Sequence, residues 1–169
     1  MKIHYLATAN IPSKSANSLQ IVKVCEAMSK LGHDVSLFVP NLITLDTSIT
    51  KYYGLNSKFK VIKVGKKLNY LSKKDNLILP FKFFFKSLFL RKDLLITRNI
   101  ILSLIFFVFR INHTLELHDD LESTGKFISK IFVKFRILNS KKIKLIFITK
   151  NLKDFIRKKY FFSNNKFKI

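Results

Sequence analysis

Short apolar runs alternate with helix-patterned segments along the whole chain, and no other feature restricts the possible folds as strongly. The runs that indicate strands lie at residues 2–9, 35–39, 59–64, 93–97, 114–117 and 144–148. Helical patterns lie around residues 21–31 and at 77–90, 100–109, 126–139 and 151–159. Strands that alternate with helices through short loops form parallel sheets with helices on both faces. We therefore predict an α/β domain with a parallel sheet of about six strands.

Local signals predict several boundaries of these elements. Asn17 or Ser18 is expected to cap the first long helix, and Gly32 to end it in the left-handed conformation. Pro40 is expected to close the second strand, because proline donates no hydrogen bond to a sheet. Three further expectations are a short helix before Gly54 in the irregular stretch 41–57, an exposed loop at 66–76, and a cap at Thr149 or Asn151 for the last helix.

The chain carries 32 basic and 10 acidic residues, a formal net charge of +22. Such a charge attracts nucleic acid, anionic lipid or phosphorylated ligands. The abundance of Lys, Phe, Ile and Asn is also what an A/T-rich genome produces, so the charge alone leaves its origin open. Nucleic acid is disfavoured as a partner, because the basic residues are spread over many elements and no RNP-type, helix-turn-helix or zinc-finger pattern is present.

Three features bear on the compartment. The single cysteine, Cys25, excludes an internal disulfide, suits a reducing compartment and lies on an apolar helix stripe as a core thiol. The longest apolar run, residues 100–109, is about half the length of a membrane-spanning helix and is predicted to be a core helix. The first residues show no signal peptide. We expect a cytoplasmic protein.

Residues 116–122 hold four of the ten acidic residues and one of the four histidines. The apolar run before them predicts a strand whose carboxyl end delivers His118 and Asp119 to a loop. Glu116 and His118 are two positions apart and share a strand face, so a metal site is one possibility, although no Cys lies nearby in sequence. Asp120 and Glu122 are expected to serve the start of the next helix instead.

Polar residues follow four of the predicted strands at their carboxyl ends, which is where parallel α/β sheets bind ligands. They are the loop 10–18, Arg98 with Asn99, His118 with Asp119, and Thr149 with Lys150. We therefore expect these four loops to line one edge of the sheet. The loop 10–18 contains no glycine, which disfavours a dinucleotide-binding turn, but backbone N–H groups at the following helix N-terminus could still meet an anion.

Six motifs occur in the order and spacing of one known family. They are IPSKSANSLQ at 11–20, CEAMSKLGHDV at 25–35, YYGL at 52–55, ITRN at 96–99, LELHD at 115–119 and ITKNL at 148–152. Together they resemble the N-terminal, acceptor-side domain of a family 4 glycosyltransferase of the GT-B fold. The resemblance covers residues 1–169 and implies one Rossmann-like half of a GT-B enzyme.

The resemblance implies a retaining, metal-independent transfer of a sugar from a nucleotide-sugar donor to an acceptor hydroxyl, with no cofactor besides the donor. By this similarity His118 is the catalytic residue and faces the donor sugar. The substrate-binding residues implied are Ser15, Asn17, Ser18, Arg98, Asn99, Asp119, Thr149 and Lys150. The family often has glycines in its first loop, where this chain has Ala16 and Asn17.

The resemblance also implies a second, donor-binding domain, which the chain does not contain. The expected partners are therefore that domain or a partner chain, and a cell-envelope glycan or lipid-linked acceptor at the inner face of the plasma membrane. Lysines of two helical segments, Lys82, Lys86, Lys126, Lys130 and Lys134, are candidates for contact with anionic lipid. Two alternatives come from other classes: a noncatalytic basic module for an anionic membrane surface or nucleic acid, and a small-molecule α/β enzyme complete in one domain.

Overall fold

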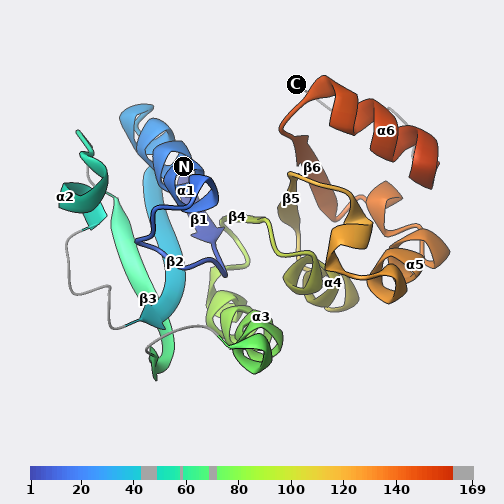
Figure 1. Cartoon of the computed structure of the whole chain (residues 1–169), viewed down its shortest axis with the longest axis horizontal. Coiled ribbons are helices and arrows are strands. Elements are labelled where there is room, and N and C mark those ends of the chain that lie inside the picture. The colour runs from blue at the N-terminus through green and yellow to red at the C-terminus, as the bar shows by residue number, and fades with distance from the viewer. Residues whose placement is uncertain (43–48, 58, 69–71, 162–169) are drawn as a thin grey trace. The chain divides into compact units, whose positions relative to one another are not determined.

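The computed structural model describes residues 1–42, 49–57, 59–68 and 72–161 (Figure 1). Within these residues, six strands form one sheet in the order β3-β2-β1-β4-β5-β6, and the pairs β1–β2, β2–β3, β4–β5 and β5–β6 are parallel. This is the strand order of the Rossmann fold. The prediction of a Rossmann-like α/β fold with a parallel sheet of six strands is confirmed.

The elements alternate along the chain as the apolar pattern predicted. The strands are β1 (Lys2–Leu6), β2 (Asp34–Leu42), β3 (Lys60–Leu68), β4 (Leu94–Thr97), β5 (His113–Leu117) and β6 (Ile143–Phe147). The α-helices are α1 (Ala16–Lys30), α2 (Ile49–Tyr53), α3 (Lys73–Ser87), α4 (Ile100–Val108), α5 (Lys126–Lys134) and α6 (Lys150–Tyr160). Short 3-10 helices cover Leu88–Leu90, Leu121–Thr124 and Ile137–Asn139. The short helix predicted before Gly54 is α2.

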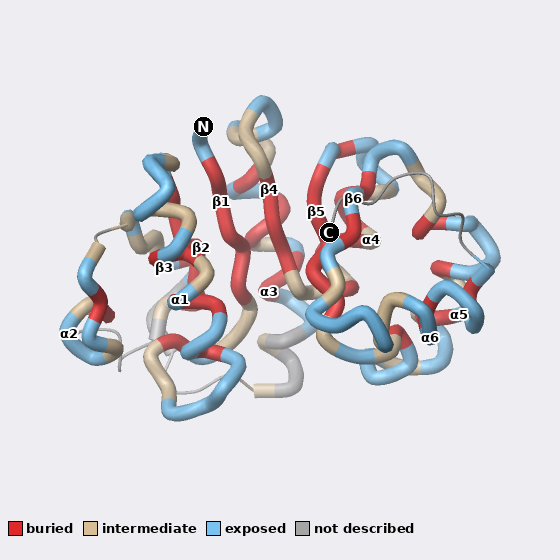
Figure 2. Tube along the Cα trace, turned by 90° about the horizontal axis from the view of Figure 1, so that it is seen from above, coloured by how far each residue is buried: buried red, intermediate tan, exposed pale blue. Residues whose placement is uncertain are grey.

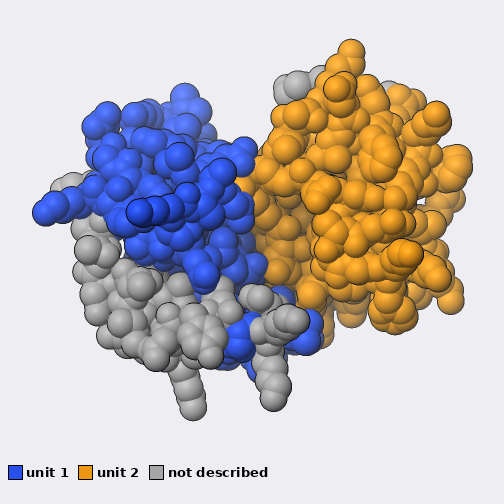
Figure 3. Space-filling view, in the orientation of Figure 1, with its two compact units in different colours: residues 1–95 blue, residues 96–169 orange. Residues whose placement is uncertain are grey.

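The chain divides into two compact units, residues 1–95 and 96–169, which Figure 3 colours separately. The boundary falls within β4. The first unit therefore contains β1, β2 and β3 and the second contains β5 and β6. Strands β1 and β5 are buried almost throughout, as the trace in Figure 2 shows. Such double-sided burial is expected of central parallel strands.

Helix α1 begins earlier than predicted. Its N-cap is Ser15, whose hydroxyl accepts a hydrogen bond from the Ser18 backbone N–H at 3.2 Å, so the expected caps Asn17 and Ser18 lie inside the first turn. The predicted end is confirmed, because Gly32 follows the helix with φ of +82°.

Strand β2 runs through Pro40, so the prediction that Pro40 closes it is wrong. The last residue of β2 in register with β1 is Phe38, opposite Leu6. Pro40 therefore lies beyond the end of that pairing and continues only along β3, opposite Val64. The register with β3 then shifts between Pro40 and Leu42. A proline, which has no N–H to donate, is tolerated at such a position, because the strand pairs there with one neighbour only and the register is irregular.

The predicted loop at 66–76 is mostly regular structure, although residues 69–71 lie outside the described residues. Strand β3 continues to Leu68, and α3 begins at Lys73. Ser72 and Asp75 form a capping box: the Ser72 hydroxyl accepts from the Asp75 N–H at 3.2 Å, and the Asp75 carboxylate accepts from the Ser72 N–H at 3.0 Å. This cap starts the helix four residues before the predicted start at residue 77.

The core of the second unit gathers buried side chains from β5, β6 and the helices around them. Its members are Ile100, Leu115, Leu117, Leu121, Phe132, Ile137, Leu138, Ile143, Leu145, Ile156 and Tyr160. The predicted helix 126–139 breaks after Lys134, because Arg136 takes a left-handed φ of 49° and a 3-10 helix then brings Ile137 and Leu138 into this core.

Helix α4 is a core helix on one face only. Leu102, Ile105 and Phe106 are buried, whereas Val108 and the following Phe109 are exposed. Among the helices of the described residues, none has the length and apolar character needed to cross a membrane.

Two phenylalanines of α5 differ strongly in burial, so their substitutions should differ in their effect on stability. Phe132→Ala should lower the free energy of unfolding by about 3–4 kcal/mol, because Phe132 is only 1% exposed and its loss leaves a cavity in the core. Phe127→Ala on the same helix should change it by less than about 0.5 kcal/mol, because Phe127 is 76% exposed. Urea denaturation followed by circular dichroism measures both values. Similar losses for the two variants would contradict this assignment of the core.

Candidate functional site

The carboxyl ends of the strands in the second unit lie in register. Thr97 of β4 pairs with Leu115 of β5, and Leu117 of β5 pairs with Phe147 of β6. The Ile148 N–H also donates to the Leu117 carbonyl at 3.3 Å. The next residues along the chain are therefore brought to one edge of this unit, as the sequence predicted for Arg98, His118 and Thr149.

Arg98, Glu116 and His118 form a cluster at this edge. Glu116 Oε1 accepts hydrogen bonds from Arg98 Nη2 at 2.7 Å and from His118 Nε2 at 2.6 Å. The side chains of Glu116 and Arg98 are only 8% and 12% exposed, whereas that of His118 is 25% exposed. Glu116 thus joins a nearly buried guanidinium to an imidazole that solvent can reach.

The Glu116 carboxylate defines the state of the His118 ring. A carboxylate accepts hydrogen bonds only, so Nε2 carries the proton in the neutral ring and Nδ1 then holds the lone pair. Nδ1 receives no hydrogen bond from the described residues. A carboxylate that orients an imidazole in this way prepares the opposite nitrogen to accept a proton or a hydrogen bond from a ligand.

The metal site left open by the acidic stretch does not form from the described residues. No group of three His, Cys, Asp or Glu side chains lies close enough among them to hold an ion. Glu116 and His118 do converge on one strand face, as their spacing predicted, but they are hydrogen-bonded to each other. Their donor and acceptor atoms are thus directed at one another.

Asn99 and Thr149 act as helix caps at this edge. Asn99 Oδ1 accepts from the Leu102 N–H at 2.8 Å and starts α4, and Thr149 Oγ1 accepts from the Leu152 N–H at 3.1 Å and starts α6. The prediction of Thr149 as the cap of the last helix is confirmed. Lys150 is the exposed first residue of α6. The substrate-binding roles implied for these three residues stay predictions.

The loop after β1 belongs to the first unit and is held by hydroxyl groups. The Tyr53 hydroxyl accepts from the Ser13 N–H at 2.7 Å and lies 2.9 Å from both the Ser13 carbonyl oxygen and Ser18 Oγ. Ser18 is fully buried, so it supports the loop rather than facing solvent. Ser15 and Asn17 are exposed at the start of α1. Of the three substrate-binding residues implied for this loop, Ser15 and Asn17 are therefore the two that a ligand can reach.

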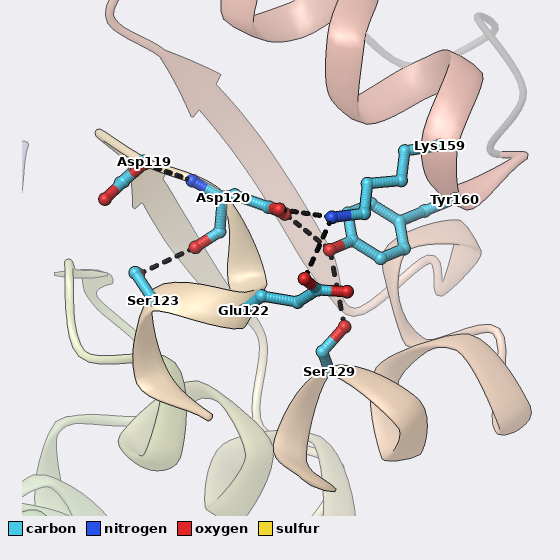
Figure 4. A network of polar contacts seen from close by, with 7 residues as sticks. All are labelled: Asp119, Asp120, Glu122, Ser123, Ser129, Lys159 and Tyr160. Atoms are coloured by element: carbon cyan, nitrogen blue, oxygen red, sulfur yellow. Dashed lines mark hydrogen bonds and ion pairs between the residues drawn. The ribbon is translucent and has the colours of Figure 1, made fainter. Parts of the chain in front are cut away.

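Asp120 and Glu122 do not cap the next helix, so that prediction is wrong. Asp120 makes no side-chain cap bond, although its position precedes the 3-10 helix Leu121–Thr124. Its carboxylate instead accepts from Lys159 Nζ at 2.5 Å and from the Tyr160 hydroxyl (Figure 4). Glu122 reaches the same Lys159 ammonium at 3.2 Å. Asp120 and Glu122 therefore bind the far end of α6.

This network changes the pKa of its members. Partial burial alone would raise the pKa of Asp120, but the hydrogen bonds from Lys159 and Tyr160 outweigh it and lower that pKa. The hydrogen bond from Asp120 raises the pKa of Lys159, and burial together with Asp120 raises the pKa of Tyr160. All three shifts favour the charged pair and the neutral phenol, which is the state that holds α6 in place.

Asp119 stays at the surface beside this network. Its Oδ1 accepts from the Asp120 backbone N–H at 2.7 Å, and its side chain points away from Lys159 in Figure 4. Asp119 therefore shapes the loop between His118 and Asp120, and its implied contact with substrate stays a prediction.

Comparisons with known proteins do not place the chain in a family. No family model matches the sequence, and no curated protein matches it.

The network predicts a pH-dependent loss of stability in Asp120→Asn. At neutral pH the variant should lose about 1–2 kcal/mol of unfolding free energy, because a charged acceptor of Lys159 and Tyr160 is replaced by a neutral one. The pKa of Asp120 is lower in the folded state, so its contribution is complete above the unfolded pKa of about 3.9 and disappears as pH falls through the folded value. The difference from the wild type should therefore shrink below about pH 4.

Urea denaturation over this pH range measures the effect. Asp119→Asn is the matched control, because Asp119 is an exposed neighbour that accepts only from the next backbone N–H. A deficit in Asp120→Asn that does not change with pH would contradict the proposed charge pairing.

Proposed function

We propose that this chain is the acceptor-side half of a retaining glycosyltransferase. It would move a sugar from a nucleotide-sugar donor to a hydroxyl of a cell-envelope glycan or a lipid-linked acceptor. The observation that carries the proposal is the hydrogen bond from His118 Nε2 to Glu116, which holds an accessible imidazole just beyond the carboxyl end of β5. The motif resemblance to family 4 enzymes of the GT-B fold supports the same reading.

In this proposal His118 contacts the donor sugar through the nitrogen that does not face Glu116. The neutral ring accepts a hydrogen bond from a sugar hydroxyl at Nδ1, while Glu116 and Arg98 keep the ring in place from behind. The bond from the anomeric carbon to the donor phosphate breaks, a bond to the acceptor oxygen forms on the same face, and the acceptor proton passes to the leaving diphosphate. Glu116 is then a positioning residue and His118 the catalytic one.

The remaining polar residues would bind the substrates. Backbone N–H groups at the start of α1, beside Ser15 and Asn17, suit an anionic group such as a diphosphate. Arg98, Asn99, Asp119, Thr149 and Lys150 would contact the acceptor or donor at the edge of the second unit. We propose no metal and no cofactor besides the nucleotide-sugar, since cationic side chains and helix N-termini are available for the leaving charge.

A nucleotide-sugar needs a second site for its nucleotide. We therefore propose a donor-binding domain or partner chain as the obligatory partner, and the cytoplasmic side of the plasma membrane as the place of action. The coding sequence immediately downstream is the first place to look for such a domain, which should be α/β with paired glutamates. Co-expression of the two products then allows transfer from labelled nucleotide-sugars to be assayed.

His118→Ala should lower the rate of transfer by this complex about a hundredfold or more, because the hydrogen bond between the ring and the donor sugar is lost in the transition state. It should change the free energy of unfolding by less than about 1 kcal/mol, because His118 is partly exposed. Glu116→Gln should lower kcat with little change in KM, because it loosens the ring rather than the substrate contacts. Transfer rates and urea denaturation of each variant measure these effects.

His33→Ala is the matched control, because His33 lies just before β2, away from the carboxyl ends of the strands. It should leave transfer unchanged. Full activity in His118→Ala would remove this residue from the site. A complex that transfers no sugar from any nucleotide donor would overturn the proposed function.

A further inference from the structure

Helix α3 is apolar on two opposite faces. One face packs into the first unit through Leu79, Phe83, Phe84 and Ser87, all of which are buried. The other face continues into the 3-10 helix Leu88–Leu90 and is exposed. Its members are Leu77, Ile78, Phe81, Phe85 and Phe89, each between 49 and 93% exposed.

These five residues, here called the α3 stripe, form a continuous line. Leu77, Phe81, Phe85 and Phe89 follow one another at intervals of four, so they lie along one side of the helix over about 18 Å. The Phe85 ring packs edge-on against the ring of the buried Phe84, with ring centroids 5.4 Å apart. The buried ring thus supports the exposed one. Contiguous exposed apolar surface of this kind marks an interaction site.

Basic residues border the α3 stripe along most of its length. From Asn76 to Lys92 the sequence contains no acidic residue and four basic ones, Lys82, Lys86, Arg91 and Lys92. At helical spacing Lys82 and Lys86 fall between the stripe and the buried face, and Arg91 and Lys92 follow its end. Lys86, Arg91 and Lys92 are exposed, and Lys82 is half-buried. The surface therefore combines aromatic rings with a mainly cationic border. The acidic residue of α3, Asp75, lies in its first turn, where its carboxylate is hydrogen-bonded to Ser72.

We infer that the α3 stripe docks on an anionic lipid surface. A helix with Phe and Leu on one side and Lys and Arg beside them lies in the plane of a bilayer, with its rings at the boundary between headgroups and acyl chains. The flanking ammonium and guanidinium groups then meet lipid phosphates. With 15 residues and internal lysines, α3 is suited to lie on the bilayer rather than to span it.

Charge complementarity favours an anionic lipid surface over a second copy of the chain as the partner of the α3 stripe. A symmetric pairing of two α3 stripes would place two identical cationic borders side by side, in a chain whose formal net charge is already +22. An anionic bilayer neutralises the same groups. The inference holds whether or not the chain takes part in sugar transfer.

Co-sedimentation of the full chain with vesicles tests the inference. Binding is expected to phosphatidylcholine vesicles that contain phosphatidylglycerol and not to pure phosphatidylcholine. Phe81→Ser with Phe85→Ser should weaken binding about tenfold or more, because two rings leave the interface. Lys82→Gln with Lys86→Gln should weaken it to a similar extent and flatten its dependence on salt.

Matched double variants outside α3 separate the effect of the α3 stripe from that of overall composition. Phe127→Ser with Phe135→Ser removes two exposed rings, and Lys141→Gln with Lys142→Gln removes two exposed lysines, so each control makes the same chemical change elsewhere. Both controls should bind as the wild type does. Circular dichroism checks that every variant is folded.

Three outcomes would overturn the inference. One is equal binding to neutral and anionic vesicles, and another is an equal loss of binding in the two control variants. The third is a dimer in analytical ultracentrifugation that Phe81→Ser with Phe85→Ser abolishes while vesicle binding persists, since the α3 stripe would then be a contact between two copies.

Discussion

The parallel pairing of β5 with β4 and β6 is the constraint on which the candidate site depends. Parallel strands end at the same edge, so the residues after Thr97, Leu117 and Phe147 come together although they are far apart in sequence. The two-residue period of β5 then puts Glu116 and His118 on the same face. Without this register, the histidine would have no buried carboxylate beside it.

The acidic residues of the stretch 116–122 make ion pairs at two places in the second unit, one nearly buried and one closer to solvent. Glu116 is nearly buried, and an isolated carboxylate there would be costly, so its hydrogen bonds to Arg98 and His118 offset part of the cost of its burial. Asp120 and Glu122 lie further out and hold the end of α6 through Lys159. The loop that carries His118 is thus anchored on both sides, by a strand before it and a helix after it.

The basic residues also occupy different environments. Arg98 and Lys159 are engaged by carboxylates within the second unit. Lys86, Arg91 and Lys92 are exposed beside a line of exposed rings. Some of the 32 basic residues are therefore engaged in ion pairs within the fold, and the exposed ones, which carry the net charge of +22, are available to an outside partner.

The alternation of apolar runs determined the α/β class, the sheet and the short helix α2, because helical and strand periods are local properties of the chain. Tertiary structure decided the rest. Pro40 stays in β2 because β1 has already ended, and Asp120 meets Lys159 39 residues away only because α6 packs there. Phe83 and Phe85 belong to one apolar helix, yet packing buries one and exposes the other, since periodicity marks faces without saying which face finds a partner.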